Sequence, residues 1–398
     1  MFDLERVRQL VGDAQVVGIG ESAHNVREYQ QVRHHLARFL VERMGFGVLA
    51  LESGFSEGLL VDRWIRDGSG DLAEVADQGL TYGFGSAVAT RDLLAWLREH
   101  NAGGGDVGFA GLDLPADLGS PLPALDGVAH YLAEVDPAAR QTLEHLRTYA
   151  LRWASPYTMA AFRAYQAVPA ADRDAQTLLL SELATRVDAL RPLYERRGGA
   201  PGYATARHQL RLAVLLDQML RAQLAAANGS GIHAAVNVRD AAMAETVRHL
   251  LRDGRRIVVS AANTHLQRIP IMLGGTFEVP VMGSHLAAEL GGAYLSIAVT
   301  AVGGRTPTRR PAPGTERGAE VLTVDLAPPA PGSVEAFLTD PASPRVTGPG
   351  SPDGPWLADL RPLRGAPGGP RRFRNLDGYV DLPVADAFDL VALVPHLA

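Results

Sequence analysis

The sequence predicts an α/β fold, with a parallel-rich central sheet flanked by helices and a large helical insertion lobe. Short apolar runs rich in β-branched residues alternate with helical patterns near the start of the chain and again after residue 237, as is typical of βαβ units. The stretch 122–228 is instead almost entirely helical and rich in Ala, Leu and Arg. We therefore expect an α/β core over 1–115 and 231–398, and a lobe over 116–230 that covers the active-site cleft.

The individual elements follow from the spacing of apolar residues. Before the lobe, strands are predicted at 14–21 (AQVVGIGE), 46–52 (FGVLALE) and 106–114 (DVGFAGLDL), with helices at 26–44, 56–66 and 88–101. After the lobe, we expect a helix at 237–254 and strands at 255–263 and 293–302. Beyond residue 303, Pro/Gly-rich segments such as GGRTPTRRPAPG (303–314) and PRVTGPGSPDGP (344–355) predict surface loops that connect a few short strands.

Composition excludes several classes of protein. The 398 residues are 46% hydrophobic and carry a net charge of −6, so they support a large core and give no basic footprint for nucleic acid. The absence of cysteine excludes disulfides, thiolate metal sites and Cys nucleophiles. All 38 basic residues are Arg, a bias typical of GC-rich genomes, and this excludes Schiff-base chemistry on lysine. The lack of an apolar leader or of an 18-residue apolar run predicts a cytoplasmic protein with no membrane partner.

Polar residues stand where several predicted strands end. Glu21, Glu52, Asp113 and His265 each lie at or just beyond the carboxyl end of a strand. In open α/β sheets ligands bind at that edge, so the four residues point to a single site. Asp113 taken alone is equally well explained as a loop acid. His24, three residues after Glu21 in a glycine-flanked loop, favours acid–base chemistry because its ordinary pKa of about 6.5 suits proton abstraction near neutral pH.

Arg33 adds an independent observation. On the predicted helix 26–44, the apolar stripe includes Tyr29 and Leu36, and Arg33 falls inside it. An inward-facing Arg requires an acidic partner, which Glu21 or Glu52 could supply.

Two other motifs compete for the chemistry. Gly18, Gly20 and Ala23 fit the dinucleotide pattern G-x-G-x-x-G/A, although Glu21 would then repel a pyrophosphate. The stretch GFSEG around Ser56 fits G-x-S-x-G, with Asp113 and His265 following in the order of α/β-hydrolases. The nucleophile turn of an α/β-hydrolase would here follow only the second strand, which is early for that fold. A helix N-cap is the simpler role for Ser56.

A family resemblance favours the acid–base site. GIGESAHNVREYQQVRHHL resembles the signature of the erythromycin esterase family, approximately G-E-x-x-H-G-x-x-E followed by an Arg and a strand ending in Glu. The matching positions are Gly20, Glu21, His24, Glu28, Arg33 and Glu52. Further similar segments are RDLLAWLREHN, FAGLDL, NVRDAAMAETV, ANTH and VMGSHLAAELGGAYLSIA. The resemblance covers 14–115 and 237–300 well, and the remainder weakly.

The resemblance implies hydrolysis of a macrolactone ester by water, without a cofactor or covalent intermediate. His24 would be the general base, and Glu21, Glu52, His265 and Arg33 would complete the catalytic set. The expected substrate-binding residues are Arg239, Asp113, Asn263 and His285. The expected partner is a small molecule, a large and mostly apolar polyketide or macrolactone.

This sequence departs from the family pattern at two positions. Asn25 replaces the Gly that usually follows the motif His, and Ala262 replaces the first His of H-N-x-H. The second change leaves open a non-hydrolytic tailoring reaction in natural-product biosynthesis, by a cyclase, lyase or transesterase, or a macrocycle-binding protein for self-resistance. A further alternative is a divalent Zn or Mn ion bound by Glu21, His24, Glu52 and His265.

Overall fold

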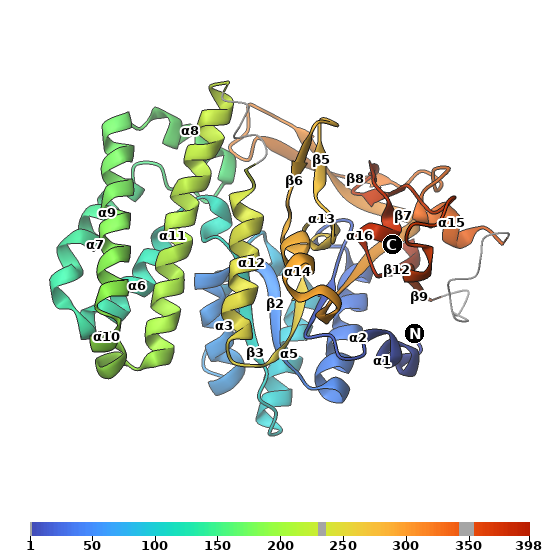
Figure 1. Ribbon diagram of the computed structural model, residues 1–398, viewed down its shortest axis with the longest axis horizontal. Helices are drawn as coiled ribbons and strands as arrows, with labels where there is room; N and C mark the ends of the chain where they lie inside the picture. Colours follow the sequence, from blue (N-terminus) through green and yellow to red (C-terminus); the bar gives the residue numbers. More distant parts are fainter. Residues whose placement is uncertain (1, 230–235, 342–353) are drawn as a thin grey trace.

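The computed structural model describes residues 2–229, 236–341 and 354–398, and confirms the α/β fold with a mostly parallel sheet flanked by helices (Figure 1). The main sheet has the strand order β3-β2-β4-β1-β7-β12-β9, and β8 pairs with β7. Its strands are β1 (Val16–Ile19), β2 (Phe46–Gly54), β3 (Gly108–Asp113), β4 (Arg256–Ser260), β7 (Tyr294–Pro311), β8 (Ala319–Asp325), β9 (Trp356–Asp359) and β12 (Leu390–Leu397). Only β8 and β9 pair antiparallel with their neighbours in this sheet.

Two small hairpins and the helices complete the described chain. The hairpins are β5 (Ile271–Leu273) with β6 (Phe277–Val279), and β10 (Arg372–Asn375) with β11 (Gly378–Asp381). The helices around the sheet are α1 (Leu4–Val11), α2 (Arg27–Met44), α3 (Phe55–Asp67), α4 (Leu72–Gly79), α5 (Val88–Ala102), α12 (Val238–Leu251), α13 (Asn263–Leu266), α14 (Met282–Leu290), α15 (Val334–Thr339) and α16 (Val384–Ala387). No helix in the described ranges is long and apolar enough to cross a membrane.

The sheet is buried on both faces, which explains why its strands are continuous apolar runs. Alternate residues of one strand point to opposite faces, so Val17 and Ile19 pack in the core beneath α2 while Val16 packs in the core beneath α12 and α14. α2 ends at Gly45, whose φ of 72° is the left-handed conformation that glycine adopts without strain.

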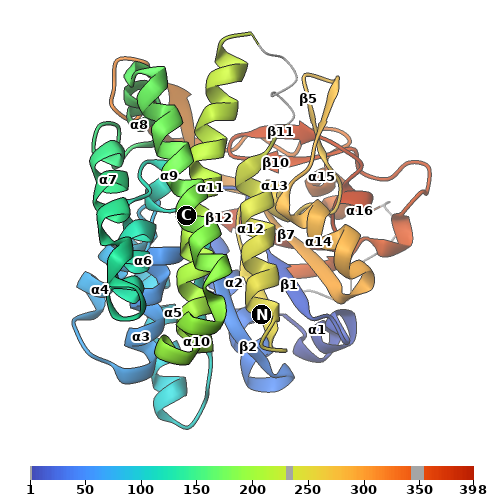
Figure 2. The same cartoon turned by 60° about the vertical axis from the view of Figure 1, so that its left-hand side comes forward.

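The helical middle of the chain packs beside the β3 edge of the sheet (Figures 1 and 2). Its helices are α6 (Leu122–Val135), α7 (Arg140–Ala150), α8 (Thr158–Ala167), α9 (Ala170–Ala189), α10 (Arg191–Gly198) and α11 (Ala200–Ala227). They enclose an apolar core of their own, and a second apolar cluster with Leu114, Trp153 and Leu216 joins them to the sheet. That this lobe covers the active-site cleft stays a prediction.

Two local expectations were wrong. The segment 303–314 is not a surface loop over its whole length, because β7 continues to Pro311 by pairing with β8. This ribbon reaches α8, where the Arg163 guanidinium donates to the Pro313 carbonyl at 3.0 Å. Ser56 is not an N-cap, because α3 already begins at Phe55 and its N-cap is Gly54. Most of the Pro/Gly-rich stretch 344–355 lies outside the described residues.

Candidate active site

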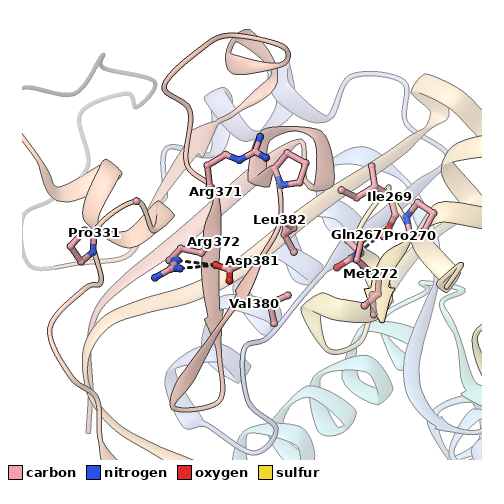
Figure 3. A pocket seen from close by; sticks show the side chains of 13 residues that line it. Gln267, Ile269, Pro270, Met272, Pro331, Arg371, Arg372, Val380, Asp381 and Leu382 are labelled. Atoms are coloured by element: carbon pink, nitrogen blue, oxygen red, sulfur yellow. Dashed lines mark hydrogen bonds and ion pairs between the residues drawn. The ribbon is translucent and has the colours of Figure 1, made fainter. Parts of the chain in front are cut away.

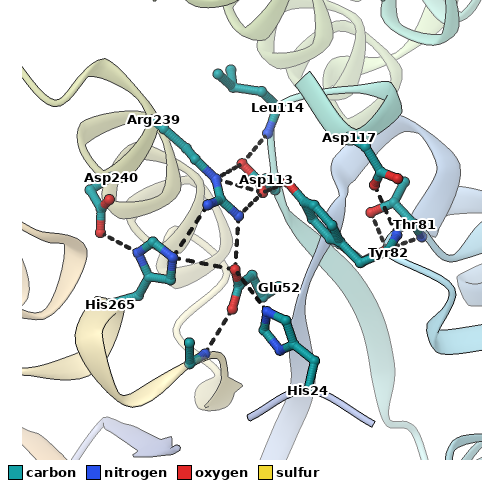
Figure 4. A network of polar contacts seen from close by, with 12 residues as sticks. His24, Glu52, Thr81, Tyr82, Asp113, Leu114, Asp117, Arg239, Asp240 and His265 are labelled. Carbon is teal, nitrogen blue, oxygen red and sulfur yellow. Dashed lines mark hydrogen bonds and ion pairs between the residues drawn. The ribbon is translucent and has the colours of Figure 1, made fainter. Parts of the chain in front are cut away.

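The polar residues predicted at strand ends lie at one edge of four adjacent strands, β3-β2-β4-β1. Asp113 ends β3, Glu52 lies near the end of β2, and Glu21 follows β1 by two residues. His265 lies on α13, directly after β4. Because parallel strands end together at the carboxyl edge, side chains far apart in sequence meet there. Figure 4 shows Glu52, Asp113 and His265 together with His24 and Arg239.

The glycines before Glu21 allow α13 to approach β1. A Cβ on Gly20 would collide with the Asn263 side chain, and a Cβ on Gly18 would press against Leu266. Asn263 itself is 1% exposed, its Nδ2 donates to the Ser22 hydroxyl at 3.1 Å, and its Oδ1 accepts the Val299 N–H at 3.0 Å. The structure therefore places Asn263 as a brace of this loop, and its expected contact with a substrate stays a prediction. The glycines serve this packing, and not a pyrophosphate.

His24 is held by Nδ1, and its Nε2 has no hydrogen-bond partner among the described residues. Nδ1 lies 2.7 Å from Glu21 Oε1, and because a carboxylate only accepts, Nδ1 carries the proton in the neutral ring. Nε2 lies 3.9 Å from Glu52 Oε1, beyond hydrogen-bonding distance. The next residue, Asn25, has φ 61°, a conformation that glycine and asparagine tolerate best. Asn is therefore compatible with this position, where the family pattern usually has Gly.

The pKa of His24 is raised above its usual value. Burial lowers it, but the charge of Glu52 and the hydrogen bond that His24 donates to Glu21 raise it by more. Beneath this pair, Arg33 is 2% exposed, with NH1 3.3 Å from the Ser260 hydroxyl and 3.7 Å from Glu21 Oε2. The acidic neighbour of Arg33 is thus Glu21, and not Glu52.

Arg239 connects the carboxylates of β2 and β3. Its NH2 donates to Glu52 Oε1 at 2.8 Å and to Asp113 Oδ2 at 2.6 Å, while its Nε donates to both oxygens of Asp113. Asp113 is therefore an ion-pair partner inside the cluster. The NH1 group of Arg239 faces His265 Nε2 at 3.4 Å and, among the described residues, makes no hydrogen bond to either carboxylate.

His265 lies between two carboxylates. Its Nδ1 is 2.8 Å from Asp240 Oδ1 and its Nε2 is 3.3 Å from Glu52 Oε1. Burial lowers its pKa, but the charges of Asp240 and Glu52 outweigh burial and raise it to about 10. The charges of His265 and His24 hold the pKa of Glu52 well below its usual range despite burial. His265 is therefore an imidazolium at neutral pH.

Sequence reasoning missed Tyr82 and Asp240. The Tyr82 hydroxyl donates to Asp113 Oδ2 at 3.0 Å, and its ring lies 5.4 Å from the Arg239 guanidinium carbon and stacks on His24 at 6.3 Å. Its φ of 55° is uncommon for an aromatic residue, and such strain persists at functional sites. The only signal in the sequence was an aromatic residue in the turn TYGFG. Asp240 lies in the segment NVRDAAMAETV, in which the sequence predicts no role for this residue.

Neither the expected role of His285 nor the alternative metal site gains support from the geometry. His285 is half-buried on α14, and no side-chain contact joins it to the cluster in the part of the chain that the structure describes. Across the same residues, no group of three or more His, Asp or Glu side chains is arranged to hold a metal ion. Both ring nitrogens of His265 face carboxylates, so neither offers a lone pair to a cation.

The G-x-S-x-G alternative does not form a triad. Ser56 Oγ is buried and has no hydrogen-bond partner among the described residues. Its supposed partners are engaged elsewhere, Asp113 with Arg239 and His265 with Asp240.

Comparisons with known proteins show the family and the fold of this chain. The family model described as erythromycin esterase matches residues 41–397. Two Escherichia coli proteins are similar: erythromycin esterase type II, 28% identical over 85% of this chain and 81% of that protein, and erythromycin esterase type I, 24% identical over 98% and 93%. The solved structure of a mutant of the erythromycin esterase EreC in its open conformation has the same fold, with a TM-score of 0.82 and 23% identity over 99% of this chain and 93% of that one.

Proposed function

The chain belongs to the erythromycin esterase family, and we propose that it is a hydrolase that cleaves a carboxylic ester or lactone with His24 as general base. The observation that carries the proposal is the free Nε2 of His24, which faces the Glu52, Arg239 and His265 cluster while Glu21 holds Nδ1. A water molecule bonded to Nε2 would lie next to the two cationic groups.

The reaction needs no covalent enzyme intermediate. His24 Nε2 takes a proton from water as the water oxygen bonds to the ester carbonyl carbon. The carbonyl oxygen becomes an oxyanion, which Arg239 NH1 and the His265 imidazolium stabilise because both positive charges are already fixed by Glu52, Asp113 and Asp240. The intermediate collapses with cleavage of the ester C–O bond, and the proton on His24 passes to the leaving alkoxide.

The charges of the cluster set its pH dependence. Four carboxylates, those of Glu21, Glu52, Asp113 and Asp240, face the three cations Arg33, Arg239 and His265. A neutral His24 thus leaves one negative charge in excess, which agrees with its raised pKa. Because the neutral ring is the base, activity increases as pH rises through that pKa.

The substrate class that we propose follows from the names of the similar proteins. Since the two similar Escherichia coli proteins are named erythromycin esterases, we propose a macrolactone or related polyketide ester as substrate, and inactivation of a macrolide antibiotic as a role. The alternatives, a tailoring reaction without water and a macrocycle-binding protein for self-resistance, rest on Ala262. Its backbone N–H donates to Glu52 Oε2 at 2.7 Å, but its methyl group contributes no imidazole where the family pattern has His.

Mass spectrometry in ¹⁸O-labelled water separates these functions. Purified protein is incubated with macrolactones and linear polyketide esters, beside His24→Ala and the matched control Ser56→Ala. We expect products heavier by one labelled water with the wild type and Ser56→Ala, and none with His24→Ala. Products of unchanged mass, or lacking a water, would indicate a cyclase or lyase instead, and saturable binding without any product would indicate a binding protein.

A further inference from the structure

A cavity lies outside the catalytic cluster. It has a volume of about 560 Å³ and opens between the β5–β6 hairpin and the base of the β10–β11 hairpin (Figure 3). Most of its walls are apolar, with Ile269, Met272, Val380 and Leu382 among the lining side chains. Cavities of this size and polarity are typical of small-molecule sites, in which a few polar groups set the orientation of the ligand.

Gln267 places an unsatisfied hydrogen-bond acceptor in this wall. The residue is 1% exposed, and its Nε2 donates to the Ile269 carbonyl at 2.8 Å. Because a carbonyl only accepts, the nitrogen must be the end that faces Ile269, which leaves Oε1 as the free end. Oε1 is buried and has no partner among the described residues. A ligand hydroxyl or N–H that donates to Oε1 would relieve the cost of this unpaired group.

Arg371 supplies a cation without a counter-ion. Its neighbour Arg372 is neutralised by Asp381, whose Oδ1 accepts from the guanidinium Nε at 2.9 Å. The exposed Arg371 lines the same cavity, but in the described ranges no carboxylate pairs with its guanidinium. Its backbone N–H donates to the Gly332 carbonyl at 2.9 Å, which fixes the position of the main chain at the rim.

The β5–β6 hairpin adds apolar surface next to the opening. Met272 is 52%, Leu273 48% and Phe277 43% exposed, whereas large apolar side chains elsewhere on this core are mostly buried. The hairpin consists of two strands of three residues each, and it gains stability when a ligand covers its exposed apolar side chains.

We propose that this cavity binds an apolar carboxylate that also carries a hydroxyl group. The apolar part lies against Ile269, Met272 and Leu382, the hydroxyl donates to Gln267 Oε1, and the carboxylate pairs with Arg371. Hydrolysis of a lactone releases an apolar hydroxy acid of this kind, so the identification of the ligand as a reaction product rests on the proposed function. The binding chemistry of the cavity does not.

The cavity is physically joined to the catalytic loop. Gln267 follows His265 by two residues, and the β10–β11 hairpin that forms one wall also holds Ser22, whose hydroxyl donates to the Arg374 carbonyl at 3.0 Å. A product retained here would therefore lie next to elements that position both catalytic histidines, without contacting them.

Isothermal titration calorimetry with 12-hydroxydodecanoate, below its micelle concentration, tests the proposal. Dodecanoate lacks the hydroxyl, and 12-hydroxydodecanamide lacks the anion and contains no ester bond. For the wild type we expect removal of the hydroxyl to weaken binding about threefold to tenfold, and removal of the anion to weaken it about twofold to fivefold. Gln267→Leu should be insensitive to the first change only, and Arg371→Gln to the second only. Arg371→Gln alters a surface residue, so it tests the proposal even if Gln267→Leu does not fold.

The outcomes separate this proposal from the esterase function. Binding that both variants leave unchanged, or no binding of the probe, overturns the cavity assignment, whatever the hydrolytic activity. Binding with the expected dependence on Gln267 and Arg371, in a protein that hydrolyses no lactone, supports the cavity and removes the esterase proposal.

Discussion

The imidazolium of His265 gives a prediction whose magnitude follows from the structure. With a pKa raised from 6.5 to about 10, protonation of His265 favours the folded state by about 5 kcal/mol. A group whose pKa is higher in the folded state contributes all of this stability below pH 6.5 and loses it as pH rises to about 10. Two carboxylates share the effect, so Asp240→Asn should remove about half of it, roughly 2–3 kcal/mol.

Two measurements examine this prediction. NMR titration of ¹⁵N-labelled His265 should give a pKa near 10 in the wild type and a clearly lower value in Asp240→Asn. Urea unfolding should show wild-type stability falling between pH 6.5 and 10, with a flatter profile for the variant. Asn237→Ala is the matched control, because it removes the 2.8 Å hydrogen bond from Asn237 to Asp240 Oδ2 but keeps the carboxylate. A wild-type His265 that titrates near 6.5, or an equal decrease in its pKa in both variants, would refute the reasoning.

Three further predictions concern the catalytic loop and its surroundings. The plot of kcat/KM against pH should rise through a pKa above 6.5, and Glu52→Gln should move this inflection to lower pH, because the charge of Glu52 raises the pKa of His24; an unmoved inflection would remove His24 as the base. Tyr82→Phe should lower kcat about tenfold with little change in KM, since it deletes the hydrogen bond to Asp113 but keeps the ring; steady-state kinetics with unchanged activity would limit Tyr82 to a packing role. Asn25→Gly should keep wild-type activity and Tm. Asn25→Val should lower the free energy of unfolding by about 1–3 kcal/mol, because a β-branched residue is strained at the φ of 61°; equal Tm values for the two variants would contradict this.

The pattern of the sequence was sufficient for the core of the fold. Apolar runs at β1, β2, β3 and β4 are local signals, and the helices between them imply parallel pairing, so the shared edge of the sheet followed without knowledge of any contact. The expected strand at 293–302 ended too early because the prolines and glycines after it are typical of loops. Pairing with β8 compensates for them, and a strand partner is not visible in local composition.

The site divides in the same way. The positions of Glu21, Glu52, Asp113 and His265 after strands predicted them as site residues, and the motif loop predicted His24. Only the tertiary structure decided that Arg33 faces Glu21, that Asn263 braces a loop, that His285 stands apart, and that Tyr82 and Asp240 belong to the cluster. The physical reason is that burial along one element repeats with its period, whereas ion pairing and the pKa of His265 depend on distances between elements, which packing alone sets.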